Sequence, residues 1–246
     1  MKTILILLLA MSSLFAQRKK QTTEYVTLKT YLRDSVIQKP FKIGYLAYTP
    51  DSYYLSTKKY PLIITCHGNG QKGTLTPDIL RKSFVPSKLD AGMNVEAVVI
   101  SPQTNGYKPK WNYAGWYKEL LDSISVKYRI NQDSIFIMGY SGGGEGVCTF
   151  VKNYPCQGIA TFAPVITLIQ SEKCLLVGKK VWGFHCTNDA TIKVTSTQNL
   201  IKDIVKCPLY PYSNLIPKAS YYTSGGHDGS WSNGLKTDSV FKYLLK

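Results

Sequence analysis

The chain has 246 residues, of which 44% are hydrophobic, so it can bury a sizeable core, and we expect one folded domain over residues 17–246. Its net charge is +15 at pH 7, but the lysines are scattered along the chain, which argues against a nucleic-acid-binding surface. No cysteine stands in a Cys-x-x-Cys or Cys/His spacing typical of zinc ligands, and we expect neither a metal nor a cofactor.

Residues 1–16, "MKTILILLLAMSSLFA", are predicted to be a secretory signal peptide. They contain Lys2, an apolar run from Ile4 to Ala10, and small residues before Gln17. That run is too short to span a bilayer, and no later stretch approaches about 20 uninterrupted apolar residues. The sequence therefore predicts a secreted or periplasmic protein without stable membrane insertion, with a net charge of +14 once Lys2 is removed.

Export makes disulfides possible, but the pairing of the six cysteines cannot be read from the sequence. Cys66 and Cys186 end apolar, strand-like runs, where a buried free thiol is favoured. The other four are expected at helix ends or in loops: Cys148, Cys156, Cys174 and Cys207. The oligomeric state is equally open.

Apolar runs of strand length alternate with helical patterns along most of the chain. The expected strands cover 24–32, 41–50, 61–68, 95–103, 134–138, 158–164, 179–186 and 219–223. The expected helices cover 115–128, a segment from about Gly143, 191–205, and a last segment from Leu235. This alternation predicts an α/β fold with a mainly parallel central sheet and helices on both of its faces.

The stretch "IMGYSGGG" at 137–144 places a serine between glycines directly after a buried strand. Gly139 and Gly143 would allow a sharp turn and a close helix behind it, with Ser141 exposed at the tip. That is the G-x-S-x-G pattern of a nucleophile elbow. A glycine-rich turn with an incidental serine gives the same five letters, so other parts of the chain must decide.

A nucleophilic serine needs a base, and the sequence has three histidines. His185 lies within the apolar run "VWGFHC" and is interpreted as a core histidine with satisfied hydrogen bonds. His67 opens the loop "HGNGQ" after a strand, which suits an oxyanion loop. His227, in the glycine-rich "SGGHDGSW" between the last strand and the last helix, is the candidate base; the alternative is a loop histidine without a role.

The base needs an acid to orient it, and Asp189 follows the strand at 179–186 on a short polar loop. The alternative role for Asp189 is the N-cap of a helix that starts near Thr191. Two further carboxylates compete: Asp228 neighbours the histidine but is expected to point elsewhere, and Glu172 lies one crossover earlier. Asp189 is the predicted acid because the carboxyl ends of parallel strands face one crevice.

Three motifs, "GYSGG", "HGNGQ" and "GGHDGSW", together with the order Ser141, Asp189, His227, resemble those of α/β-hydrolase serine esterases. The resemblance is to secreted polyhydroxybutyrate depolymerase-like and feruloyl-esterase-like proteins, and it extends from about residue 41 to the end. It implies an α/β-hydrolase fold with Ser141 as nucleophile, His227 as general base and then acid, and Asp189 as its orienting group.

The resemblance also implies an oxyanion hole formed by the backbone amides of Gly142 and Asn69. The position of Asn69 is often cysteine or glycine in that family. An asparagine there keeps its backbone role, and its side chain could add a donor or partly block the pocket.

The candidate residues are separated by 48 and 38 positions, which leaves little room for a lid domain. We therefore expect an open cleft for an ester substrate that is short-chain or carbohydrate-linked. Tyr140, Trp231 and Trp111 could form an aromatic platform for substrate, or could equally pack the loops. A serine peptidase of the same fold and a catalytically silent binding protein are the alternative functions.

Overall fold

The computed structural model describes residues 21–28, 32–33, 36–37, 40–73, 75–104 and 110–246. The predicted signal peptide at 1–16 lies outside these residues. No helix in the described part of the chain is both long enough and apolar enough to cross a membrane.

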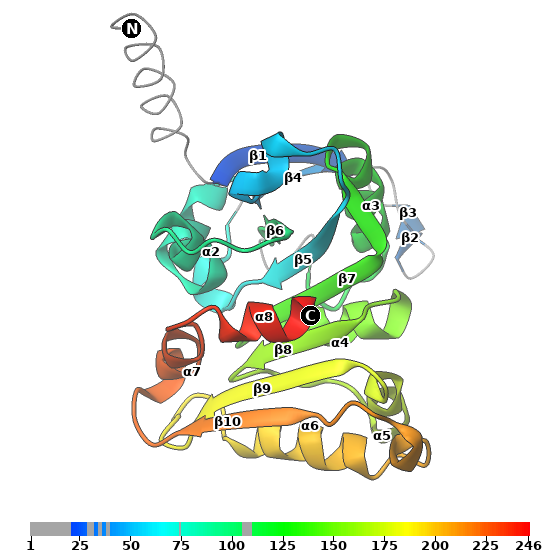
Figure 1. The fold of residues 1–246 in the computed structure, drawn as a ribbon, viewed down its shortest axis with the longest axis vertical. Helices are drawn as coiled ribbons and strands as arrows, with labels where there is room; N and C mark the ends of the chain where they lie inside the picture. The colour runs from blue at the N-terminus through cyan, green and yellow to red at the C-terminus, as the bar shows by residue number, and fades with distance from the viewer. Residues whose placement is uncertain (1–20, 29–31, 34–35, 38–39, 74, 105–109) are drawn as a thin grey trace, which may run out of the picture.

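Within the described residues, eight strands form one sheet in the order β1, β4, β6, β5, β7, β8, β9, β10 (Figure 1). Strand β4 pairs antiparallel with β1 and with β6, and the other neighbours pair parallel. The strands are β1 (Gln21–Leu28), β4 (Phe41–Tyr48), β5 (Tyr60–Cys66), β6 (Val98–Pro102), β7 (Ile130–Tyr140), β8 (Gly158–Phe162), β9 (Lys180–Cys186) and β10 (Lys218–Tyr222). A separate two-stranded ladder joins β2 (Leu32–Arg33) to β3 (Val36–Ile37).

Helices cover both faces of the sheet, as the alternating pattern predicts. The helices are α2 (Phe84–Asp90), α3 (Gly115–Lys127), α4 (Gly143–Asn153), α5 (Gln170–Lys173), α6 (Thr195–Val205), α7 (Gly226–Gly234) and α8 (Ser239–Leu245). Short 3-10 turns are η1 (Asp51–Leu55), η2 (Asn69–Gln71), η3 (Pro77–Lys82), η4 (Cys174–Leu176) and η5 (Tyr210–Tyr212).

Two apolar clusters fill the spaces between these helices and the sheet. Side chains of α3, α4 and α6 pack in one cluster, and side chains of α2 and α8 pack in the other. Neighbouring residues of a strand point to opposite faces, so Leu62 and Ile64 of β5 belong to the first cluster while Ile63 belongs to the second. The central strands therefore need apolar residues at every position, which explains their continuous apolar sequence.

The apolar stripe predicted on the helix at 115–128 is confirmed. Trp116, Leu120 and Ile124 of α3 are completely buried, and Tyr128 packs partly buried against the same cluster. Residues four apart lie on one face of a helix, and this face covers the sheet.

Several predicted boundaries are wrong. Strand β1 begins at Gln21 and not at 24, and β7 is longer than 134–138 at both ends. Residues 29–31 of the predicted first strand lie outside the described part of the chain. Helix α6 begins at Thr195 and not at 191, because the carboxylate of Asp189 accepts the nearby amides in a turn that precedes the helix.

The largest correction concerns the end of the chain, where the last helix does not begin at Leu235. The chain enters α7 at Gly226 and leaves it before Leu235, and α8 follows from Ser239. Gly225 has φ +108°, a left-handed conformation that lets the chain turn directly into α7. The glycine-rich segment predicted to be a loop is therefore mostly helical.

The structure pairs Cys174 with Cys207, which links η4 to the segment after α6. The other four cysteines are buried free thiols, which confirms the prediction for Cys66 and Cys186. Cys148 lies inside α4, not at a helix end.

Candidate active site

The turn between β7 and α4 places Ser141 in a strained backbone conformation. Its φ is +54°, which is unusual for a residue with a side chain. Three hydrogen bonds hold it there: Ser141 N–H donates to the carbonyl of Phe162, and the amides of Gly144 and Val165 donate to the Ser141 carbonyl, each at 2.9 Å. The strain is thus balanced by contacts with β8 and the chain after it.

The glycines of this turn are needed because the helix packs closely behind the strand. A Cβ added to Gly139 would stand 2.5 Å from the carbonyl oxygen of Gly143. A Cβ added to Gly143 would stand only 2.0 Å from the carbonyl oxygen of Cys66 in β5. A glycine-rich turn with an incidental serine, the alternative interpretation of the sequence, would not explain why both glycines lie so close to backbone carbonyls.

Gly143→Ala is expected to lower the free energy of unfolding by at least about 1–3 kcal/mol, because the new methyl group overlaps backbone atoms that have no room to move. Urea denaturation followed by circular dichroism measures this. Gly70→Ala is the matched control, since a Cβ at Gly70 meets nothing within 4 Å. Equal stability of the two variants would contradict the packing argument.

Ser141, His227 and Asp189 form a continuous chain of hydrogen bonds. His227 Nε2 lies 2.8 Å from Ser141 Oγ, and His227 Nδ1 lies 2.7 Å from Asp189 Oδ2. The carboxylate can only accept, so Nδ1 carries the proton and Nε2 is free to accept the proton of the serine hydroxyl. This arrangement can activate a hydroxyl for attack on an acyl group.

Asp189 is held as a carboxylate at the buried end of this chain. Its side chain is fully buried, and its Oδ1 accepts the amides of Thr191 at 2.8 Å and Ile192 at 3.0 Å. Burial alone would raise the pKa of Asp189, but the hydrogen bonds from His227, Ile192 and Thr191 outweigh it and leave the pKa below its usual value. Asp189 therefore holds both a local turn and the imidazole.

His185 is the buried core histidine that the sequence predicts. Its Nδ1 accepts the hydroxyl of Thr197 at 2.8 Å, and its Nε2 donates to the carbonyl of Ile192 at 2.9 Å. The same Nε2 also lies 3.3 Å from Asp189 Oδ2, the oxygen that His227 uses. The sequence analysis missed the contact between His185 and Asp189. The two residues are only four positions apart, but the apolar run around His185 indicated a core position and nothing more.

The loop after β5 passes directly beside Ser141. A Cβ on Gly68 would stand 3.3 Å from Ser141 Cβ, and a Cβ on Gly142 would stand 2.5 Å from Asn69 Oδ1. The side chain of Asn69 therefore lies over Gly142, the residue after the serine, and Asn69 is exposed. The predicted oxyanion residues are adjacent in space.

The buried His67 holds the loop after β5 in place through hydrogen bonds. Its Nδ1 donates to the carbonyl of Gly68 at 2.6 Å, and its Nε2 accepts the amide of Thr104 at 2.9 Å. Trp111 Nε1 donates to the His67 carbonyl at 3.1 Å. Burial lowers the pKa of His67 to about 4, so the ring stays neutral and keeps both hydrogen bonds.

The buried neutral His67 makes stability depend on pH. Between its unfolded pKa of about 6.5 and its folded pKa of about 4, only the unfolded chain takes up the proton, so stability falls as pH falls through this window. The loss attributable to His67 is about 3 kcal/mol. His67→Gln, which does not titrate, should show a correspondingly smaller loss of unfolding free energy between pH 7 and pH 4.

Comparing the two proteins over the same pH range removes the contribution of His185, whose pKa burial also lowers. Parallel stability profiles for wild type and His67→Gln would contradict the assignment of this pH dependence to His67.

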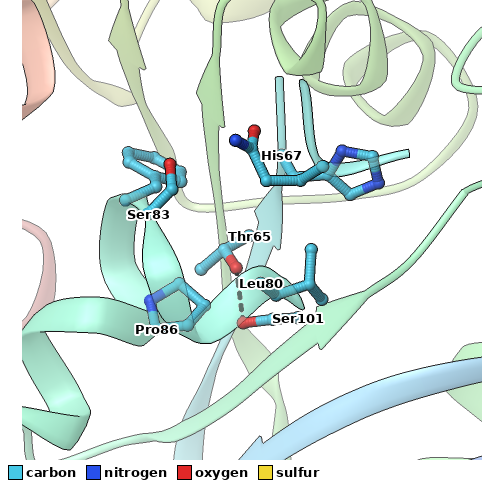
Figure 2. Close-up of a pocket in the computed structure, with 8 residues that line it drawn as sticks. Thr65, His67, Leu80, Ser83, Pro86 and Ser101 are labelled. Atoms are coloured by element: carbon cyan, nitrogen blue, oxygen red, sulfur yellow. Dashed lines mark hydrogen bonds between the residues drawn. The ribbon is translucent and has the colours of Figure 1, made fainter. Parts of the chain in front are cut away.

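A small cavity next to the loop after β5 is lined by residues of β5, β6, η3 and α2 and by His67 and Gln71 (Figure 2). It offers about 10 Å³, close to what one water molecule requires. Two of the lining residues are joined by a hydrogen bond that Thr65 donates to Ser101 at 2.6 Å (Figure 2). Ser141 and His227 do not line it, so it is a packing cavity behind the site and not a substrate pocket.

The three aromatic residues considered for substrate lie in different environments. Tyr140 and Trp111 are only 5% and 4% exposed, and Trp231 is partly exposed. The Tyr140 hydroxyl donates to Asp228 Oδ1, and Trp231 Nε1 reaches the same oxygen at 3.3 Å. The imidazole of His227 bonds to Asp189 and Ser141, whereas Asp228 bonds to Tyr140, a contact that the sequence did not indicate.

The competing carboxylate Glu172 lies away from this site. Its Oε2 accepts the amide of Ile169 at 3.0 Å, and its Oε1 faces Lys152 at 3.6 Å. It belongs to α5, whose first turn it caps.

No protein-family model matches the chain, and no curated protein matches it. Solved structures do resemble it: a thermostable esterase has a TM-score of 0.63 at 17% identity, over 89% of this chain and 62% of the esterase. A ferulic acid esterase has a TM-score of 0.59 at 14% identity, over 93% of this chain and 100% of that enzyme.

An acylaminoacyl peptidase from Pyrococcus horikoshii has a TM-score of 0.60 at 10% identity, over 96% of this chain and 43% of the peptidase. These likenesses, with the strand order described above, show that the chain has the α/β-hydrolase fold, which confirms the predicted fold class.

Proposed function

We propose that this protein is a serine hydrolase that cleaves carboxylic esters through an acyl-serine intermediate. The observation that carries the proposal is the chain of hydrogen bonds from Ser141 through His227 to Asp189, with the serine at a strained elbow. The esterase names among the structural neighbours support the reaction class.

In the first half of the reaction Ser141 Oγ attacks the ester carbonyl while His227 Nε2 takes its proton. The carbonyl oxygen becomes an oxyanion beside the backbone amides of Gly142 and Asn69, and each such donor contributes about 3–4 kcal/mol of transition-state stabilisation. His227 then returns the proton to the leaving alcohol, which leaves the acyl group on Ser141. In the second half, a water molecule attacks the acyl carbon while His227 Nε2 takes its proton. The bond between the acyl carbon and Ser141 Oγ then breaks, His227 returns the proton to Oγ, and the carboxylic acid leaves.

The proposed substrates are short-chain or carbohydrate-linked esters outside the cytoplasm. The short spacing between the three residues leaves little chain for a cover over the cleft, and the strongly basic composition favours anionic surroundings. Activity on p-nitrophenyl esters should be highest from acetyl to butyryl and fall steeply by octanoyl.

A fluorophosphonate probe and a substrate panel test the proposal together. The probe should label Ser141 in the purified protein, which mass spectrometry of tryptic peptides locates. The panel compares p-nitrophenyl esters, feruloyl and acetyl sugars, hydroxybutyrate oligomers and aminoacyl amides. Turnover confined to the amides would favour the peptidase, a class represented among the neighbours. Absence of labelling would favour the silent binding protein.

A further inference from the structure

We propose that Tyr140 and Asp228 are a pair of positioning residues, whose hydrogen bond fixes the helix that carries His227 against the strand that carries Ser141. The proposal rests on the function proposed above, because it concerns the alignment of that same serine and histidine. It assigns Tyr140 a role different from the substrate platform expected from the sequence.

The pair joins the two elements at the point where their alignment matters. Tyr140 is the last residue of β7 and directly precedes Ser141, and Asp228 directly follows His227 in the first turn of α7. The Tyr140 hydroxyl donates to Asp228 Oδ1, so each partner is one residue away from a reacting group.

Two other hydrogen bonds of α7 reach a different part of the sheet. Gly226 N–H donates to Asn188 Oδ1, and Ser230 Oγ accepts the amide of Cys186, both at 3.0 Å. These bonds fix α7 relative to β9 and the loop after it. The bond from Tyr140 to Asp228 fixes it relative to β7, which lies on the other side of β8 from β9.

Tyr140 is itself firmly held. Its ring is 5% exposed, with its centroid 5.1 Å from that of the His227 imidazole and 5.9 Å from that of Phe84. Burial, followed by the hydrogen bond and charge of Asp228, raises the pKa of Tyr140 well above its usual value, so the hydroxyl remains a donor. A buried ring whose hydroxyl is already bonded offers little surface to a substrate.

The expected consequence is kinetic, because a displacement of about 1 Å between reacting groups costs on the order of 100-fold in rate. Tyr140→Phe removes the hydroxyl and keeps the ring, and should lower kcat about 10- to 100-fold with little change in KM. Asp228→Ala should do the same. Asp228→Asn keeps an acceptor for the phenol and should retain a kcat close to that of wild type.

Tyr154→Phe is the matched control, since its hydroxyl bonds the carbonyl of Ala114 at 2.8 Å, outside this site. It should leave kcat unchanged. The double variant Tyr140→Phe with Asp228→Ala should be no slower than Asp228→Ala, since the two residues act through one bond. Additive losses would contradict this coupling.

A spectroscopic measurement separates this proposal from the proposed function. In protein labelled at its histidine nitrogens, the Nδ1–H resonance of His227, assigned by its loss in His227→Gln, reports the bond to Asp189 without any substrate. Tyr140→Phe and Asp228→Ala should broaden or shift it, and Tyr154→Phe should not. These changes would support the positioning role even if no ester were hydrolysed.

Two outcomes would overturn the proposal. An unchanged resonance and unchanged kcat in Tyr140→Phe would show that the bond does not align the imidazole. An increase in KM alone would show that Tyr140 contacts the substrate, as the sequence had suggested.

Discussion

Ser141→Ala is expected to abolish labelling by a fluorophosphonate and to lower kcat/KM for p-nitrophenyl acetate by at least about 10⁴-fold. Without Oγ there is no nucleophile for His227 to activate, and only attack by water remains. Because the hydrogen bonds that hold the Ser141 backbone do not involve its side chain, the unfolding midpoint should change little. Stopped-flow assays and thermal unfolding measure the two effects.

Ser232→Ala is the control for this experiment, since it removes a hydroxyl from α7 without touching the hydrogen-bonded chain. It should keep wild-type activity and labelling. If Ser141→Ala kept more than a tenth of the activity, or if the label moved to another serine, the nucleophile would lie elsewhere.

The elbow was predictable from sequence because its cause is local. Gly139 and Gly143 lie two residues on either side of Ser141, directly after the apolar run at 134–138 that predicts a buried strand. The close packing behind the turn leaves no room for a side chain at either glycine. The spacing of the two glycines around the serine therefore indicates the sharp turn from the sequence alone. Asp189 and His227 were predicted by the same rule, that functional groups follow the carboxyl ends of parallel strands, and the structure places them in hydrogen-bond contact.

Helix α7 was missed because local propensity contradicts the fold. Three glycines among its nine residues disfavour a helix, yet the helix forms because it packs against β9. A Cβ on Gly229 would stand 2.7 Å from Cys186 Sγ, so this glycine permits the contact that stabilises the helix. Only the packed structure shows that a helix-breaking residue is required there.

Contacts between distant segments could not be predicted either. The Tyr140 to Asp228 bond joins residues 88 positions apart, and the disulfide joins residues 33 positions apart. Such pairs depend on how strands and helices pack, and six cysteines allow many pairings. His185 shows a different limit, because its place in the core was predicted while its approach to Asp189 depends on the turn at Thr191 and Ile192.

Asp189→Asn is expected to lower kcat about 10⁴-fold with little effect on the fold. Asp189 Oδ1 accepts two backbone amides, so an asparagine will keep its oxygen there and turn its NH₂ toward His227. An NH₂ group donates where the carboxylate accepted, so His227 Nδ1 must become an acceptor and its proton must move to Nε2. Nε2 then cannot take the proton of Ser141, and the first step of the reaction loses its base.

Glu172→Gln is the matched control, because it makes the same chemical change in a carboxylate that lies on α5 and is not bonded to His227. It should leave kcat unchanged.

The pH dependence of unfolding gives an independent check. The lowered pKa of Asp189 stabilises the wild-type fold above the unfolded pKa of about 3.9, and this contribution is lost as pH falls through the folded pKa. Asp189→Asn should lack that part of the acid transition. A larger loss of kcat in Glu172→Gln than in Asp189→Asn would move the acid to the preceding loop, and the hydrogen bond between His227 and Asp189 would then have no part in the reaction.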